Sequence, residues 1–388
     1  MPDMIGIGLI GCGFAAGLHA RGYQLAAGLG VRVVAVAARH HERAETFAQR
    51  YGVPAVYDNA VSVIEDPAVH VVDLALPNAY HHSLAIAAAQ AGKHVICEKP
   101  LTGYFGDGGT PKVIMLEEAL RNTEAMIEAA QAHGVKLMYA ENLIYAPAIQ
   151  KTKRLIEASG GILLNIRGEE SHSGSHAAYA KRWRESGGGS LLRLGAHPIG
   201  VALYLKRCEG LAREGQPILP VSVMGEVASL TKMPAFQAEE CPWLVKDWED
   251  VEDWSSIIVT FSDGSRGTFI ATDTLLGGMR DRLEFSLSNA RIICDLTHGG
   301  PMRAYAPDPA VFADEYIAEK LETKAGWSFP STDEEWALGY PQEMRDFVDA
   351  VIEDRPPRSD AQLGRDVVNV IYSAYLSAAE GRRVALQP

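Results

Sequence analysis

Positive charge is scarce in this chain of 388 residues, which has 36 lysines and arginines against 49 aspartates and glutamates. The formal net charge is −13. A nucleic-acid groove or a contact with an anionic membrane needs an excess of basic residues, so we expect neither as the main partner. A small anionic substrate stays open, because a pocket can be basic inside an acidic protein.

Cysteine and long apolar runs are also scarce. The cysteines stand far apart, with no Cys-x-x-Cys pair, at Cys12, Cys97, Cys208, Cys241 and Cys294. A disulfide framework of the kind found in short secreted chains is therefore not expected. No stretch approaches the roughly 18 uninterrupted apolar residues of a membrane span. Residues 1–4 also lack the basic and apolar regions of a signal peptide. We predict a reduced, cytoplasmic protein with no membrane partner.

What the chain does have is ample core and a regular pattern in its first half. Apolar residues make up 47% and charged residues 22%, which is ordinary for a globular protein. At roughly 150 residues per domain, the length suggests two or three domains. Short apolar runs alternate with helix-like segments at the spacing of βαβ units, which predicts a parallel sheet covered on both faces. These runs are residues 5–10, 31–37, 69–76, 94–97 and 135–140.

The pattern changes after about residue 145. Longer strand-like segments are separated by turn sequences such as Ser262-Asp263-Gly264, which favours an antiparallel sheet with one face packed and one presented. Two helical segments, 342–353 and 362–380, close the chain. We predict an α/β fold with a doubly wound parallel sheet in residues 1–143 and a C-terminal α/β domain with an open, mostly antiparallel sheet in residues 144–388. The last helices are candidates for packing back on the first domain.

A glycine motif, Gly11-Cys12-Gly13-Phe14-Ala15-Ala16, directly follows the first apolar run. In a dinucleotide-binding turn, the first glycine permits the tight turn and the second lets the pyrophosphate approach the backbone. A small third residue allows close packing of helix on strand, and the helix start offers free N–H groups to the phosphates. The context of strand, turn, helix and second strand predicts dinucleotide binding by Gly11, Gly13, Phe14 and Ala16. A tight turn without a ligand is the alternative.

The end of the second run bears on the choice of dinucleotide. An NAD-selective site usually has an acidic residue there for the ribose hydroxyls. Here the run ends in Ala38 and Arg39. Ala38 cannot accept a hydrogen bond through its side chain, whereas Arg39 could meet a 2′-phosphate. The predicted cofactor is therefore NAD(P), with a lean toward NADP, unless Arg39 only stacks on the adenine or caps a loop.

Four segments carry a resemblance to a known family. They are GLIGCGF at 8–14, Pro77-Asn78 with His81, AGKHVICEKPL at 91–101 and GGGSLLRLGAHP at 187–198. With these segments in this order, the chain resembles the glucose–fructose oxidoreductase / inositol dehydrogenase family, called Gfo/Idh/MocA, over nearly its whole length. The resemblance implies an N-terminal Rossmann domain, a C-terminal domain whose open sheet helps line the active site, and a homodimer or homotetramer. It also implies cofactor binding by Pro77, Asn78, His81 and Glu98.

Two residues in these segments are candidates for catalysis. Lys99 ends an apolar run at the edge where doubly wound folds place ligands. A partly desolvated ammonium there could hold or move the proton of a reacting hydroxyl, and the resemblance implies that Lys99 touches both the nicotinamide ribose and the substrate. His197 matches the histidine of the family's Asp-x-Gly-x-His-x-x-Asp pattern. A neutral imidazole can accept a hydroxyl proton as hydride leaves the carbon. The alternatives are a surface lysine and a structural histidine.

Both acids of that pattern are absent, because Arg193 and Gly200 occupy their positions. Their absence argues against a plain polyol site in which a carboxylate grips a hydroxyl. Lys181, Arg182 and Arg184 lie just upstream, and arginine forks bind carboxylate, phosphate or sulfonate oxygens bidentately. These side chains and Arg193 could therefore hold an anionic substrate. A solvated basic stretch that pairs with acidic neighbours explains them equally well.

Two further segments fall at the expected rim of the substrate site. Glu141 and Asn142 follow the last apolar run of the first half, and Glu170 and His172 follow the first strand of the second half. We expect both segments to bind sugar hydroxyls. Glu170 and His172 could form a metal site with His176, but the spacing matches no defined ligand set and the serine and glycine neighbours indicate a loop. No metal is predicted.

Three functions remain, in this order. The first is an NAD(P)-dependent oxidoreductase that moves a hydride between nicotinamide and a hydroxyl-bearing carbon of a sugar, sugar acid or cyclitol. The second is redox-neutral cleavage of a glycoside, in which a ring hydroxyl is oxidised, the aglycone is eliminated, water adds and the ring is reduced again. Glu141 or the segment 169–176 could supply the extra acid or base. The third is a non-catalytic dinucleotide-binding regulator, which the presence of Lys99 and His197 disfavours.

Overall fold

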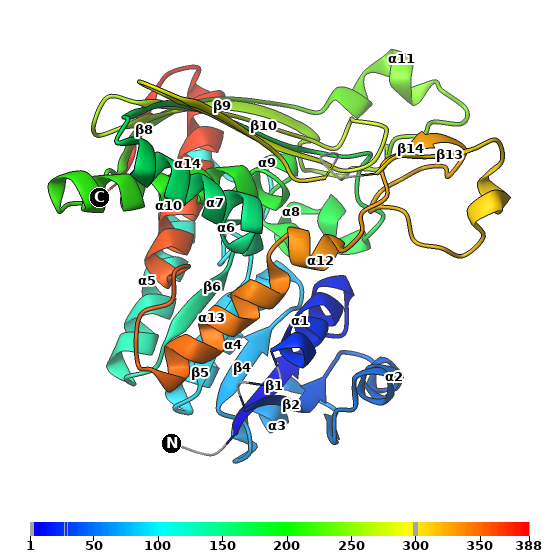
Figure 1. Cartoon of the computed structure of the whole chain (residues 1–388), viewed down its shortest axis with the longest axis vertical. Helices are drawn as coiled ribbons and strands as arrows, with labels where there is room; N and C mark the ends of the chain where they lie inside the picture. Colours follow the sequence, from blue (N-terminus) through cyan, green and yellow to red (C-terminus); the bar gives the residue numbers. More distant parts are fainter. Residues whose placement is uncertain (1–3, 27, 29, 298–301, 388) are drawn as a thin grey trace. The chain divides into compact units, whose positions relative to one another are not determined.

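The computed structural model describes residues 4–26, 28, 30–297 and 302–387. The chain forms two compact units (Figure 1). Unit 1 consists of described residues within 1–103, 117–146 and 339–368, and unit 2 of those within 104–116, 147–338 and 369–388. Residues 1–3, on which the expectation of no signal peptide partly rests, lie outside the described residues. The domain limit between residues 143 and 144 stays a prediction.

Unit 1 is built on a six-stranded sheet in the order β3-β2-β1-β4-β5-β6, and all of its described pairings are parallel. The strands β1 and β4 are buried along their whole length, as expected where helices cover both faces. The predicted doubly wound sheet is confirmed. The strands are β1 (Ile5–Ile10), β2 (Val31–Ala37), β3 (Ala55–Tyr57), β4 (Val71–Leu74), β5 (His94–Glu98) and β6 (Leu137–Ala140).

The helices of unit 1 include one from the far end of the chain. α13 (Tyr340–Ile352) runs alongside α1 (Phe14–Leu25) in Figure 1. A Cβ atom at Gly22 would lie 2.8 Å from the Met344 side chain, so glycine permits this close approach. The other helices are α2 (His41–Tyr51), α3 (Ala60–Glu65), η2 (Asn78–Tyr80), α4 (His81–Gln90), α5 (Lys112–Ala132), of which residues 117–132 belong to this unit, and α6 (Asn142–Tyr145).

Unit 2 is built on a seven-stranded sheet in the order β12-β11-β7-β10-β9-β8-β15. β7 and β10 pair in parallel and the other described pairs are antiparallel, which confirms the predicted open, mostly antiparallel sheet. The strands are β7 (Leu163–Ser171), β8 (Pro220–Ala228), β9 (Trp254–Phe261), β10 (Arg266–Thr272), β11 (Arg280–Leu287), β12 (Arg291–Asp295) and β15 (Val384–Ala385), with a separate hairpin of β13 (Ala304–Ala306) and β14 (Gly326–Ser328).

One face of this sheet is covered by helices. α9 (Ser190–Arg193) packs on β9 and β10, and α10 (Ala196–Glu214) packs on β7, β10 and β11. Buried and less buried residues alternate along β9 and β11, as in a sheet with one presented face. The remaining helices are α7 (Pro147–Ser159), η3 (Ala178–Lys181), α8 (Trp183–Ser186), η4 (Leu230–Lys232), α11 (Pro234–Gln237), η5 (Pro309–Phe312), α12 (Glu334–Ala337) and, at the end of the chain, α14 (Ala361–Glu380).

One local expectation is wrong. Residues 169–171, which we expected to lie in a loop, are the last three residues of β7. Because β7 is paired on one side with β10 and on the other with β11, its ladder holds these polar residues in the strand. The pleat then separates the two acids: Glu170 is buried, whereas Glu169 is partly exposed.

Candidate active site

The carboxyl ends of five strands in unit 1 carry residues predicted to bind cofactor or substrate. β1 is followed by Gly11–Ala16, β2 by Arg39, β4 by Pro77-Asn78, β5 by Lys99 and β6 by Glu141-Asn142. These strands are consecutive in the sheet and parallel. Parallel strands end at one edge, and open α/β sheets bind ligands there, where the strand order reverses. The structure therefore brings these predicted residues of unit 1 together in one row.

Glycine is present at positions 11 and 13 of the motif for two different structural reasons. Gly11 has φ +117°, and a Cβ atom there would lie 1.9 Å from the carbonyl oxygen of Ala75. Gly13 precedes α1, whose first turn has no side-chain cap, and a Cβ atom at Gly13 would meet nothing within 4 Å. Open space beside an uncapped helix start is what a pyrophosphate requires. Phe14 is exposed and Ala16 is buried, which suits close packing of α1. These residues fit a dinucleotide.

Arg39 is exposed directly after β2, whereas His81 is fully buried. The ring nitrogens of His81 each lie 3.0 Å from a carbonyl oxygen, one of Pro100 and one of Leu76. Burial lowers the pKa of His81, although these carbonyls oppose the effect. His81 therefore ties the chain after β4 to the chain after β5. Cofactor binding by His81 stays a prediction.

Glu98 joins the site to a histidine that the sequence analysis missed. Its Oε2 accepts a hydrogen bond from the backbone N–H of Lys99 at 2.8 Å, and its Oε1 lies 3.1 Å from Nε2 of His19 on α1. His19 is fully buried and in turn contacts Asp73 on β4. A signal existed in the sequence, because Asp73 interrupts the apolar run VHVVDLAL. Its partner is far away in the sequence, so no local pattern reveals it.

Two buried carboxyls lie in the same unit. Burial raises the pKa of Glu141 well above its usual range, against the opposing charge of Lys99. Burial likewise raises the pKa of Glu343 on α13, against the opposing charge of His19. Both carboxylate oxygens of Glu343 are buried without a hydrogen-bond partner among the described residues. Burial therefore favours the protonated form of both carboxyls. Glu343 was also missed by the sequence analysis.

In unit 2, His197 lies in the first turn of α10 and its Nε2 is 3.9 Å from Oε2 of Glu170. His197 is 7% exposed and Glu170 is 3% exposed. Glu170 projects from β7, so the sheet supplies a carboxylate beside the histidine that the helix motif itself lacks. A carboxylate at this place can orient an imidazole and stabilise its charged form.

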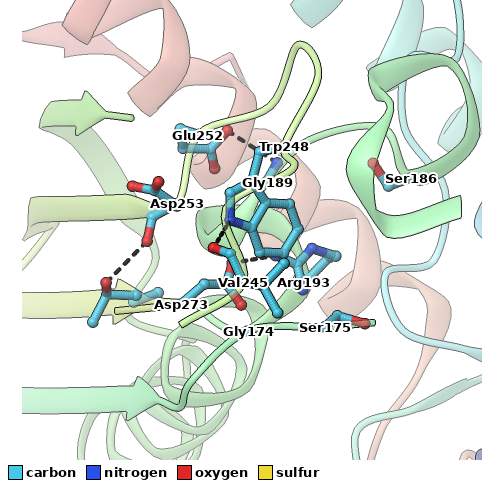
Figure 2. Close-up of polar contacts among 12 residues, drawn as sticks. Gly174, Ser175, Ser186, Gly189, Arg193, Val245, Trp248, Glu252, Asp253 and Asp273 are labelled. Atoms are coloured by element: carbon cyan, nitrogen blue, oxygen red, sulfur yellow. Dashed lines mark hydrogen bonds and ion pairs between the residues drawn. The ribbon is translucent and has the colours of Figure 1, made fainter. Parts of the chain in front are cut away.

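Arg193 has a buried acidic partner. Its guanidinium pairs with Asp273, which follows β10 and is fully buried. The guanidinium carbon lies 4.9 Å from the centre of the Trp248 ring, and Figure 2 shows this stacking. Burial raises the pKa of Asp273 while Arg193 opposes it. His172 is buried nearby and accepts the N–H of Gly174 on Nδ1 at 2.9 Å.

The glycine-rich segment before α9 is held by a second buried acid. Glu252 accepts the N–H group of Gly189 at 2.9 Å (Figure 2). It also accepts the N–H group of Leu191 at 2.9 Å and the hydroxyl of Tyr375 at 2.8 Å. A Cβ atom at Gly189 would lie 1.9 Å from the carbonyl oxygen of Glu252. Glycine is therefore needed at this position so that the segment leading to Arg193 can pack against Glu252.

The upstream basic stretch is largely paired with acids. Lys181 pairs with Asp247, and Arg182 lies 2.9 Å from Glu249 and 3.0 Å from Glu185. Arg184 is exposed, as is His176. Within the described part of the chain, no group of three or more His, Cys, Asp or Glu residues is placed to hold a metal ion. No helix there is both long and apolar enough to cross a membrane.

Comparison with known proteins identifies the family. The family model described as "Oxidoreductase family, NAD-binding Rossmann fold" matches residues 5–141, and "Oxidoreductase family, C-terminal alpha/beta domain" matches residues 153–386. The chain belongs to the Gfo/Idh/MocA oxidoreductase family. The resemblance noted from the sequence is confirmed. Membership makes the chain an oxidoreductase with an NAD-binding Rossmann domain.

Two relatives with assigned activities are dehydrogenases. The chain is 31% identical over 287 residues to levoglucosan dehydrogenase of Pseudarthrobacter phenanthrenivorans, covering 69% of this chain and 67% of that protein. It is 34% identical over 169 residues to trans-1,2-dihydrobenzene-1,2-diol dehydrogenase of Mus musculus, covering 43% and 46%.

Solved structures share the fold across the whole chain. GenD2 from gentamicin A biosynthesis, in complex with NAD, has a TM-score of 0.80 at 24% identity, covering 100% of this chain and 98% of that one. Levoglucosan dehydrogenase in complex with NADH and levoglucosan has a TM-score of 0.74 at 23% identity, covering 99% and 100%.

Proposed function

We propose that this protein is an NAD(P)-dependent dehydrogenase that transfers a hydride between nicotinamide and a hydroxyl-bearing carbon of a sugar or cyclitol. One observation carries the proposal. The open, uncapped turn at Gly13 follows β1, the Glu98-Lys99 pair lies at the end of β5, and these two strands flank β4 in one parallel sheet. Relatives named levoglucosan dehydrogenase and D-apiose dehydrogenase support a carbohydrate as the substrate class.

Unit 1 would hold the dinucleotide. Gly11 and Gly13 let the backbone approach the pyrophosphate, and the first N–H groups of α1 bind it. The exposed Arg39 directly follows β2 and is our reason to compare NADP⁺ with NAD⁺. The bound nicotinamide supplies the acceptor for the hydride. Lys99 orients the reacting hydroxyl through its ammonium group, and the Glu98 carboxylate holds the backbone of Lys99 in place.

His197 would take the proton. As the hydride leaves the carbon, the hydroxyl proton passes to the imidazole of His197, and the products are a ketone, a reduced nicotinamide and an imidazolium. Glu170 stabilises that imidazolium from 3.9 Å. Asn142 and His172 remain proposed contacts to substrate hydroxyls. A cytoplasmic homodimer or homotetramer also remains part of the proposal.

The substrate is proposed to be uncharged. The guanidinium of Arg193 already has the buried carboxylate of Asp273, and Lys181 and Arg182 have carboxylate partners of their own. An anionic substrate would have to share or compete for these cations, and if it displaced Asp273 that carboxylate would be left as a buried, unpaired charge. The expectation of an anionic substrate therefore becomes the less favoured alternative.

Glycoside cleavage without net redox change is the second candidate, and Glu141 is the observation that favours it. Elimination of an aglycone needs an acid to protonate the leaving oxygen. Glu141 is a fully buried carboxyl, and burial raises its pKa well above the usual range and so favours the protonated form, against the opposing charge of Lys99.

The test is the near-ultraviolet absorbance of reduced nicotinamide after enzyme, NAD⁺ or NADP⁺ and a sugar are mixed. The panel contains neutral sugars, cyclitols, sugar acids and their glycosides, and Lys99→Ala and His197→Ala serve as controls. A sustained rise with a neutral sugar, lost in both variants, supports the proposal. A burst limited to the bound cofactor, with glycoside still disappearing, supports glycoside cleavage instead. No rise and no loss of any sugar or glycoside contradicts both.

A further inference from the structure

A chain of hydrogen bonds leads from the backbone of Lys99 into the core of unit 1. From Lys99 it passes through Glu98 to Nε2 of His19, as described above. On the other side of the ring, Nδ1 of His19 lies 3.0 Å from each carboxylate oxygen of Asp73. His19 comes from α1, Asp73 from β4 and Glu98 from β5. The chain therefore links the glycine-turn helix to the strand that carries Lys99.

The geometry determines the charge of His19. Each ring nitrogen faces a carboxylate oxygen, and an ionised carboxylate can only accept hydrogen bonds. A neutral imidazole has one N–H, so the lone pair of its other nitrogen would face a carboxylate. An imidazolium donates a hydrogen bond to both carboxylates. The same conclusion follows from electrostatics: burial would lower the pKa of His19, but the Asp73 and Glu98 carboxylates outweigh burial and raise the pKa well above its usual range.

The groups around His19 come from four elements. Besides Asp73 and Glu98, Glu343 on α13 faces it electrostatically, and the ring of Tyr340 lies 6.3 Å from its ring. One turn along α1, the hydroxyl of Tyr23 donates to Asp73 at 2.7 Å. A buried charge is costly unless it is paired, and apolar side chains would fill the same space without that cost. The arrangement therefore suggests a role beyond packing.

We propose that His19 is a positioning residue for Lys99: held as an imidazolium by Asp73, it fixes the carboxylate of Glu98, which in turn fixes the backbone N–H of Lys99 at the cofactor edge of the sheet. The inference rests on the proposed function in one respect, namely that Lys99 and Glu98 contact the dinucleotide. His19 itself touches neither cofactor nor substrate. It acts through Glu98.

The experiment compares His19→Asn with Tyr23→Phe in the full chain. His19→Asn removes the charge and at least one of the two hydrogen bonds, whereas Tyr23→Phe removes an uncharged hydrogen bond to the same Asp73. NADH binding is followed by nicotinamide fluorescence across pH, and melting temperature is recorded for each variant. His19→Asn should weaken NADH binding about tenfold, as loss of a residue that orients a binding group does. Tyr23→Phe should change the NADH affinity by no more than about twofold, although its melting temperature should fall by an amount comparable to that of His19→Asn.

The pH dependence separates positioning from packing. In the wild type, NADH affinity should be flat between about pH 6 and 8, because His19 stays charged. In His19→Asn, two buried carboxylates lose their shared cation, which favours proton uptake by one of them, so NADH binding should become pH-dependent. If His19→Asn fails to fold, His19→Gln is measured instead. A variant that melts at a lower temperature but binds NADH like the wild type at every pH would show that the network only stabilises the fold, and would overturn the proposal.

A second readout needs no ligand. Ring ¹⁵N chemical shifts of His19 should show both nitrogens protonated at neutral pH, and a single N–H would overturn the proposal. Neither measurement depends on sugar oxidation. An enzyme that oxidises no sugar, yet loses NADH affinity in His19→Asn and not in Tyr23→Phe, would refute the proposed substrate while supporting this inference.

Discussion

At the scale of single residues, the acids absent from the α9–α10 segment are replaced by carboxylates from the sheet beneath it. Asp273, just after β10, pairs with Arg193, and Glu170 on β7 lies 3.9 Å from His197. Both acids come from the sheet against which α9 and α10 pack. The charge around the proposed base is thus determined by strands, although the sequence motif that identifies the base lies on a helix.

Glu170 is predicted to govern the pH response of the reaction. A neighbouring carboxylate favours imidazolium, so without it His197 releases its proton at lower pH. In Glu170→Gln, the acidic limb of the pH profile of kcat should therefore move to lower pH, and kcat should fall about tenfold or more because the base is less well oriented. Glu169→Gln is the matched control, since Glu169 lies one residue earlier on the other side of the pleat. Equal profiles for both variants would contradict the role.

Arg193 is predicted to act on stability and not on the recognition of acids. In Arg193→Ala, Asp273 loses its partner, and breaking a buried pair costs about 3–5 kcal/mol of unfolding free energy. The KM values for neutral sugars and sugar acids should change by the same factor. Replacing both members, as Arg193→Met with Asp273→Asn, should recover much of the stability. Thermal melts and parallel KM measurements decide the matter. A KM increase confined to sugar acids would restore the anionic-substrate hypothesis.

Glu343 predicts how stability changes with pH. Its pKa is raised in the folded protein by burial, so the folded state holds a proton that the unfolded chain releases near pH 4.5. Its favourable contribution is complete below that value and is lost as pH rises toward the folded pKa, at about 1.4 kcal/mol per pH unit. Glu343→Gln keeps the shape without the ionisation. Its melting temperature should exceed that of the wild type by a margin that grows as the pH rises above about 4.5. Parallel curves for the two proteins would refute this.

At the scale of elements, the turn between β1 and α1 gives a matched pair of variants. A side chain at Gly13 points into open space, whereas one at Gly11 collides with the carbonyl of Ala75 and adopts an unfavourable φ. Gly13→Val should therefore keep the wild-type melting temperature to within a few degrees and lose NADH binding. Gly11→Ala should lower the melting temperature itself. Calorimetry with and without NADH distinguishes them. Normal NADH binding by Gly13→Val would contradict a pyrophosphate site at this turn.

Element prediction worked where one local pattern decides the structure. The runs at 5–10 and 31–37 coincide with β1 and β2, because both are apolar and buried on both faces. β7 was predicted too short, because the acids at its end resemble a loop until the pairing with β10 and β11 is known. The short strand β3 has no run long enough to predict it.

The residues of the site likewise divide into those that the sequence predicted and those that it did not. Lys99 and His197 could be found because each stands in a short motif whose spacing is itself informative. The pairs that surround them join residues distant in the chain: His19 with Asp73, Arg193 with Asp273 and His197 with Glu170. A single sequence contains no local signal for such a pair. A charged residue in an apolar run, such as Asp73, indicates only that a partner must exist somewhere.

At the scale of the whole molecule, unit 1 is assembled from three separate stretches of chain, with residues 339–368 joining 1–103 and 117–146. The late stretch contributes core: Met344 and Phe347 are fully buried in α13. It also contributes polar contacts, because Asp346 accepts the hydroxyl of Tyr145 at 3.0 Å and the carbonyl of Ser359 accepts the N–H of Tyr139 at 3.1 Å. A division of the chain near residue 143 would separate the late stretch from residues 1–143 and would break the hydrogen bond between Ser359 and Tyr139.

The last prediction follows from that assembly. The fragment 1–146 should not fold, because burial of Met344, Phe347 and Val348 is worth about 2 kcal/mol each, a large share of the roughly 5–15 kcal/mol that stabilises a typical domain. The same fragment joined by a flexible linker to residues 339–368 should regain a cooperative melt and bind NADH. Circular dichroism and nicotinamide fluorescence measure both properties. A cooperative melt with NADH binding by 1–146 alone would show that the early strands and helices suffice and that α13 is an accessory to a self-sufficient dinucleotide-binding domain.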